Sequence, residues 1–145
     1  MATLRKFLEA DGFNRKPLKK LNTGHYHLEF KVNGHTGSFI LDSGASSSCI
    51  GVHAQAHFGL ESFESEVKAA GAGATGMEAS VSNQTRLDLN QRTYLKVVFV
   101  LFDLSHVNEA LKSVGEAPID GILGADLLKR FRAVIDYGRN ALYFK

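Results

Sequence analysis

The stretch from Phe39 to Ser46 constrains the fold of this chain more than any other. An apolar run, Phe39 to Leu41, leads directly into Asp42, and Ser43-Gly44 then supplies a residue pair suited to a tight turn. A carboxylate in apolar surroundings is costly unless it is hydrogen-bonded or shares a proton with a partner group. The pattern therefore predicts a buried strand that ends at a polar turn, and it occurs once in the sequence.

A second segment, Pro118 to Leu128, carries the apolar pair Ile122-Leu123, then Gly124, and then a pattern typical of a short helix. The order and separation of the two segments resemble those of retropepsin-like aspartic proteases, in which hydrophobic residues precede Asp-Thr/Ser-Gly. The resemblance covers about residues 26–144. It is closest to bacterial single-domain members and to the retroviral-like domain of the DNA-damage-inducible shuttle proteins. It implies a mainly β, barrel-like fold with short helices and one lobe per chain.

This resemblance implies an aspartic endopeptidase in which Asp42 is the catalytic residue. Two facing carboxylates are needed, one ionised and one protonated, so a chain with one such turn must pair with a second copy of itself. We therefore expect a homodimer that binds an extended peptide or protein substrate and uses neither a cofactor nor a metal. The rest of the active-site turn is expected to be Ser43, Gly44, Ala45 and Ser46, and the second signature Ile122, Leu123 and Gly124.

Individual turn residues carry further expectations. Gly44 is expected to adopt a backbone conformation closed to other residues. By resemblance, Ser43 replaces the usual threonine in hydrogen bonds across the two-fold axis. Ala45 stands where pepsin-like enzymes often have a hydroxyl that bonds the carboxylate, so we expect activity nearer mildly acidic than strongly acidic pH.

A glycine-rich segment lies between the two signatures. It matches the Gly-x-Gly-x-x-Gly pattern of dinucleotide sites, but strand and turn formers follow it where that role requires a helix. The family places a flap hairpin here, and we expect Val67 to Val81 to form it, because small residues let backbone amides approach an extended peptide. The predicted flap residues are Gly71, Ala72, Gly73, Ala74, Thr75 and Gly76.

Length and composition agree with one catalytic domain. The chain has 145 residues, 44% of them hydrophobic, with 14 Gly and 2 Pro, which favours short strands and frequent turns. Residues 1–24 are expected to form a basic arm with a short helix, and residues 25–145 the protease domain. Residues 1–20 hold six basic and two acidic side chains, and we expect a solvated arm that does not bind nucleic acid. The apolar run from Val97 to Phe102 is too short to cross a bilayer, so we expect no membrane span. A single cysteine, Cys49, fits a reducing compartment, and we expect a cytoplasmic protein.

Local patterns predict several elements. Tyr26 to Val32 alternates as a strand, Asn33-Gly34 favours a hairpin turn, and the returning strand, Ser38 to Leu41, leads to Asp42. Tyr94 to Phe102 is expected to be buried on both faces. Helices are expected over residues 3–10, 52–58, 105–113 and 125–131, the third capped by Ser105, with Val107, Ala110, Leu111 and Val114 facing the core.

Three other hypotheses fit parts of the sequence. A non-catalytic peptide-binding or scaffold module on the same dimeric fold stays open, although an intact Asp42-Ser43-Gly44 favours catalysis. A metal-dependent hydrolase using His53 and His57 is disfavoured because two ligands do not make a zinc site. A second acid from the same chain is disfavoured because Asp126 fits the first turn of a helix and Asp120 fits a turn.

Overall fold

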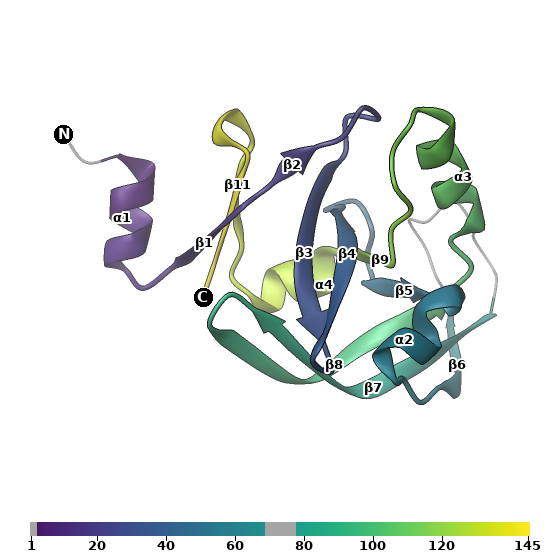
Figure 1. Cartoon of the computed structure of the whole chain (residues 1–145). Helices are drawn as coiled ribbons and strands as arrows, with labels where there is room; N and C mark the ends of the chain where they lie inside the picture. Colours follow the sequence, from purple (N-terminus) through teal and green to yellow (C-terminus); the bar gives the residue numbers. More distant parts are fainter. Residues whose placement is uncertain (1–2, 69–77) are drawn as a thin grey trace.

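A six-stranded closed barrel forms the centre of the molecule (Figure 1). The computed structural model describes residues 3–68 and 78–145. The barrel closes because the first and last strands of a run of six also pair with each other. In order of pairing the six strands are β3 (Tyr26–Val32), β4 (His35–Leu41), β9 (Gly121–Leu123), β5 (Cys49–Gly51), β8 (Arg92–Phe102) and β7 (Glu78–Leu89). Two further strands, β2 (Lys19–Lys20) and β6 (Phe63–Lys68), pair with β3 and β7 respectively.

The hairpin of β3 and β4 leads to the turn that begins at Asp42, as the sequence predicts. Asn33 and Gly34 both have positive φ, 51° and 82°, which gives the turn a twist that matches two antiparallel strands. β4 starts at His35, three residues earlier than expected, and then lies parallel to β9 with Ile40 beside Ile122. The two signature segments are therefore neighbours in the sheet.

Alternation along the strands separates two hydrophobic clusters. Phe39 and Leu41 belong to the large cluster that fills the barrel, whereas Ile40 belongs to a second cluster outside it. The prediction that Tyr94 to Phe102 is buried on both faces is wrong for part of β8. Leu95 and Val98 are 60% and 45% exposed, because that part of β8 is covered on one side only.

Short helices connect the strands. Thr3 caps α1 (Leu4–Ala10) by accepting a hydrogen bond from the backbone N–H of Lys6, as predicted. The segment after β5 forms a 3-10 turn, η1 (Val52–Ala54), and α2 (Gln55–Phe58), and the segment after β9 forms α4 (Ala125–Arg130).

The remaining helix, α3 (Ser105–Ser113), differs from its prediction in two ways. Ser105 does not cap it, and the Asp103 carboxylate instead accepts from the Ser105 N–H. Among the four residues expected to face the core, Leu111 is buried and Val107 is partly buried, whereas Ala110 and Val114 are exposed. The helix therefore packs along a narrow stripe.

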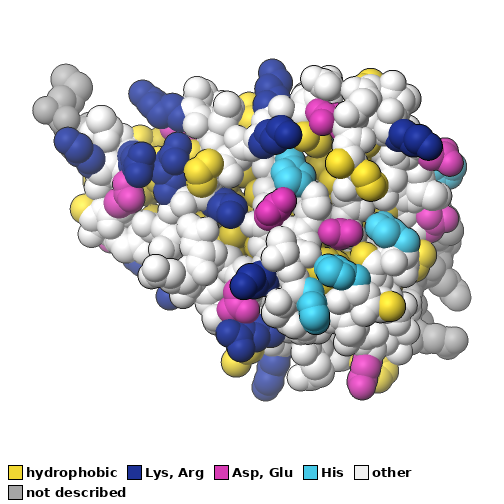
Figure 2. Space-filling view, in the orientation of Figure 1, with side chains coloured by type: hydrophobic (Ala, Val, Ile, Leu, Met, Phe, Trp, Pro, Cys, Tyr) yellow, Lys and Arg dark blue, Asp and Glu magenta, His cyan; other side chains and the backbone are white. Residues whose placement is uncertain are grey.

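A second, three-stranded sheet joins the two ends of the chain. β11 (Ala141–Phe144) lies between β1 (Asn14–Pro17) and β10 (Val134–Asp136), and η2 (Tyr137–Arg139) connects β10 to β11. Leu8 of α1 packs on this sheet with Ala141 and Tyr143. Figure 2 shows Lys and Arg side chains gathered over this N-terminal end. No helix among the described residues is long and apolar enough to cross a bilayer.

Candidate active site

Asp42 lies immediately after β4, at the point where the chain leaves the barrel. Its backbone N–H donates to the Leu123 carbonyl at 2.9 Å, so the chain stays beside β9 as far as Asp42. The Asp42 Oδ1 accepts from the Gly44 N–H at 2.9 Å, and the Asp42 carbonyl accepts from the Ala45 N–H at 3.1 Å. These bonds form a tight turn that presents a partly exposed carboxylate.

Gly44 is needed for space and not for a special backbone angle. Its φ lies outside the left-handed region, contrary to the sequence-based expectation. A Cβ at this position would lie 3.2 Å from the Asp42 Oδ1, a closer approach than most side chains tolerate. A Gly44→Ala change would therefore crowd the Asp42 carboxylate itself. Ser43 and Ser46 of the turn are exposed, whereas Ala45 is buried.

The second signature holds the back of this turn. The Ala125 N–H donates to the Ala45 carbonyl at 2.7 Å. A Cβ on Gly124 would lie 2.7 Å from the same carbonyl oxygen, so only glycine lets the two segments approach this closely. The structure thus brings together the active-site turn and the Ile122-Leu123-Gly124 signature that the sequence predicts.

Ser48 is a site residue that the sequence reasoning missed. It is fully buried, and its hydroxyl donates to the Asp126 Oδ1 at 2.7 Å and accepts from the Gly124 N–H at 2.8 Å. The Ser48 N–H also donates to the Asp126 Oδ1, at 2.9 Å. Asp126 lies in the first turn of α4, as predicted, and additionally anchors the active-site segment. No sequence signal separates Ser48 from its neighbours Ser46 and Ser47.

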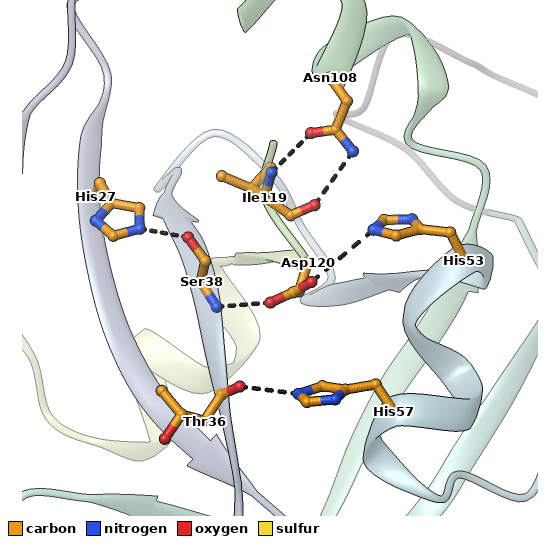
Figure 3. Close-up of polar contacts among 8 residues, drawn as sticks. All are labelled: His27, Thr36, Ser38, His53, His57, Asn108, Ile119 and Asp120. Atoms are coloured by element: carbon orange, nitrogen blue, oxygen red, sulfur yellow. Dashed lines mark hydrogen bonds and ion pairs between the residues drawn. The ribbon is translucent and has the colours of Figure 1, made fainter. Parts of the chain in front are cut away.

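The second acid considered in the sequence, Asp120, precedes β9 and lies in a polar network with Ser38 and His53 (Figure 3), whereas Asp42 bonds Leu123 at the other end of β9. The Asp120 Oδ2 accepts from the Ser38 N–H at 2.9 Å, and its Oδ1 lies 3.9 Å from the His53 Nε2. His57 Nε2 contacts the Thr36 carbonyl at 3.0 Å instead of approaching His53. Within residues 3–68 and 78–145 no three His, Cys, Asp or Glu side chains are grouped for a metal ion.

Burial perturbs two titratable groups near these strands. It raises the pKa of the Cys49 thiol to about 12, because the thiolate would be poorly solvated inside the second cluster. Burial also lowers the pKa of His27, an effect that the nearby Glu29 partly opposes. Cys49 is therefore a packing residue, in agreement with the sequence-based interpretation.

The predicted flap is described only at its base. β6 and β7 form an antiparallel pair with Phe63 opposite Val81, and β7 continues into the barrel beside β8. The predicted flap residues themselves lie outside the described residues: Gly71, Ala72, Gly73, Ala74, Thr75 and Gly76.

The barrel, the Asp-Ser-Gly turn and the glycine that supports it define an acid-protease lobe. Residues 28–127 match the aspartyl protease family, and the chain belongs to that family. No curated protein matches the sequence significantly.

Several solved structures share the fold. A retropepsin-like aspartic protease from Rickettsia conorii aligns with a TM-score of 0.60 and 17% identity, over 91% of this chain and 89% of that one. The retroviral protease-like domain of Ddi1 from Leishmania major gives 0.57 and 18%, over 82% and 86%. The EIAV protease complexed with the inhibitor HBY-793 gives 0.56 and 16%, over 76% and 90%. The expected mainly β, retropepsin-like fold is confirmed.

Proposed function

We propose that the chain is an aspartic endopeptidase that acts as a homodimer on extended peptides. One observation carries this proposal. In this chain, which belongs to the aspartyl protease family, a partly exposed Asp42 lies in a turn that is held by backbone N–H groups of the turn itself and by the second signature. The carboxylate is positioned for chemistry, and the missing second acid is supplied by the same turn of a second copy.

In the proposed dimer the two Asp42 carboxyl groups share one proton, because like charges at hydrogen-bond distance cannot both ionise. The ionised Asp42 removes a proton from a water molecule as that water attacks the peptide carbonyl. The protonated Asp42 stabilises the oxyanion and then donates its proton to the leaving nitrogen. Neither a covalent intermediate nor a metal is part of this scheme.

The Ser48 hydrogen bonds support this chemistry indirectly. They tie the segment that follows Asp42 to α4 and to the Gly124 N–H, so the turn cannot drift away from β9. To share a proton, the two Asp42 carboxyl groups must be held at hydrogen-bond distance, with their positions fixed to within about 0.5 Å. A rigid turn in each copy lowers the free-energy cost of that alignment.

A cleavage assay tests the proposal. A mixed peptide library is incubated with the full chain over a range of pH and protein concentration, with and without a pepstatin-type inhibitor. We expect cleavage that rises faster than linearly with concentration, is greatest at mildly acidic pH and is blocked by the inhibitor.

Two variants make the assay specific. Asp42→Asn is expected to abolish cleavage, whereas Asp11→Asn, a change at an exposed surface carboxylate, is expected to leave it intact. A rate strictly proportional to concentration with full activity in Asp42→Asn would refute the proposal. Peptide binding without cleavage in the native chain would instead favour a binding module on the same fold.

A further inference from the structure

The α1 helix turns an apolar face to solvent at the N-terminal end of the molecule. Leu8 is buried against the three-stranded sheet, whereas Leu4 and Phe7, three positions apart and so on one side of the helix, are 43% and 67% exposed. Phe7 has the largest exposed fraction among the large hydrophobic side chains that the structure describes. Lys6 is exposed next to it. The chain itself therefore leaves an apolar surface with a cation beside it uncovered.

A cavity of about 530 Å³ lies between η1 and α3, and we call it the α3 cavity. This volume falls within the range of pockets that hold ligands, roughly 300–1,000 Å³. The surface of the cavity is mostly apolar, and the exposed side chains of Val52 and Pro118 contribute to it. The charged and titratable side chains that line it are those of Asp103, Glu109, Glu116, Lys112 and His53.

The charges of the two surfaces are complementary. With His53 neutral, the α3 cavity carries three negative charges and one positive charge, whereas residues 1–20 hold six basic and two acidic side chains. Figure 2 shows most of the visible Lys and Arg side chains on the half of the molecule that carries α1, and mainly Asp, Glu and His side chains on the half that carries α3. Opposite charges steer two surfaces together and fix their orientation. The α3 cavity therefore favours an occupant that is both apolar and basic.

The α1 helix cannot reach the α3 cavity of its own chain. Only residues 11–13 connect α1 to β1, and β1 is paired with β11 from Asn14 to Pro17. Figure 1 shows α1 and α3 at opposite ends of the molecule. An α1 helix in this cavity must therefore come from a second copy of the chain.

We propose that the α3 cavity binds the α1 helix of a second copy of this chain, with Leu4 and Phe7 against the apolar surface and Lys6 beside the carboxylates. The inference goes beyond the proposed function, because neither surface includes the Asp42 turn. Phe7 is expected to contribute most of the binding free energy, since a few buried aromatic side chains dominate many interfaces. The two surfaces are different, so each can be removed without the other.

Complementation between two variants tests the inference. Phe7→Ala removes the aromatic side chain from α1, and Val52→Arg places a long charged side chain in the α3 cavity. Both positions are exposed, so both variants should fold, and circular dichroism checks this. All proteins are full chains that also carry Asp42→Asn, so that cleavage does not interfere. Association is measured by sedimentation equilibrium over a range of concentrations.

Each variant alone is expected to associate roughly thirtyfold more weakly than its parent. An equimolar mixture of the two should recover association, because the intact α1 of the Val52→Arg chain binds the intact cavity of the Phe7→Ala chain. Val98→Arg is the matched control, because Val98 is 45% exposed on β8 and does not line the cavity, and it should leave association unchanged. Pairing through the Asp42 turns would contribute equally to all these proteins, so it shifts the baseline and not the comparison.

The outcomes separate this inference from the proposed chemistry. If the mixture recovers association while the native chain cleaves no peptide, the α1 inference stands and the endopeptidase proposal fails. The inference is overturned if both variants associate as tightly as the parent, or if their mixture stays as weak as each alone. Loss of association in Val52→Arg but not in Phe7→Ala would show that another part of the second copy fills the cavity, and would also overturn it.

Discussion

Ser48→Ala tests whether the active-site turn is held by a buried hydroxyl. The hydroxyl bridges a carboxylate that is itself partly solvated and a buried backbone N–H, at 2.7 and 2.8 Å. The bond to Asp126 is worth about 1 kcal/mol at such a site, and leaving the Gly124 N–H without a partner costs about 2 kcal/mol. We therefore expect the free energy of unfolding to fall by about 3 kcal/mol, which corresponds to a decrease in Tm of about 10 °C.

The measurement is urea unfolding followed by far-ultraviolet circular dichroism, because the chain has no Trp. Protein concentration is held fixed, since dimerisation would add its own stabilisation. Ser113→Ala is the matched control. Its hydroxyl donates to the Ala110 carbonyl at an exposed site, and we expect a change within about 0.5 kcal/mol.

Asp126→Asn then divides the effect of Ser48→Ala between its two causes. The amide keeps an oxygen that accepts from Ser48 and loses only the charge, so we expect a cost of at most about 1 kcal/mol. A Ser48→Ala variant as stable as the native chain would refute the reasoning. An Asp126→Asn variant as damaged as Ser48→Ala would show that the carboxylate, and not the Gly124 amide, carries the energy.

Three further predictions concern single groups. Gly124→Ala is expected to lower the free energy of unfolding by about 2 kcal/mol in chemical denaturation, because the added Cβ would collide with the Ala45 carbonyl. Gly138→Ala is the control and should be tolerated, because the nearest atom to its Cβ would be 3.6 Å away. Equal losses in the two variants would contradict this prediction. With a pKa of about 12 and 4% exposure, the Cys49 thiol should resist alkylation at pH 8 in the native chain and react after denaturation; rapid native labelling would disprove its burial. The folded state lowers the pKa of His27 below 6.5, so protonation favours unfolding and stability should fall as the pH drops below 6.5. His27→Gln should reduce the dependence of the free energy of unfolding on pH, measured in unfolding experiments at a series of pH values. His106→Gln, a change at an exposed histidine, should leave this dependence unchanged. The same slope against pH in the native chain and in both variants would argue against the effect.

Local sequence was sufficient for the elements whose cause is local. The alternation of Tyr26 to Val32 and the Asn33-Gly34 turn determine the hairpin that carries Asp42, since both depend on residues close together in the chain. Thr3 caps α1 for the same reason. The resemblance identified the two signature segments, and the structure adds that they lie side by side, because β4 pairs in parallel with β9.

Tertiary packing decided the features that depend on distant neighbours. Ser48, and not Ser46 or Ser47, supports the turn, because its partner Asp126 is 78 residues away and only packing selects which serine reaches it. Ala110 and Val114 were expected in the core, but both are exposed, and Leu111 is the α3 residue that is buried in the second cluster.

The sequence by itself therefore determined the strand pattern, the turn that carries a single acid, and the family. The tertiary structure decided which side of each element is covered, how close Gly124 approaches Ala45, and which residues of α3 reach the second cluster. The physical reason is that periodicity and turn preference act over a few residues, whereas burial and buried hydrogen bonds depend on surfaces that exist only after the barrel has closed.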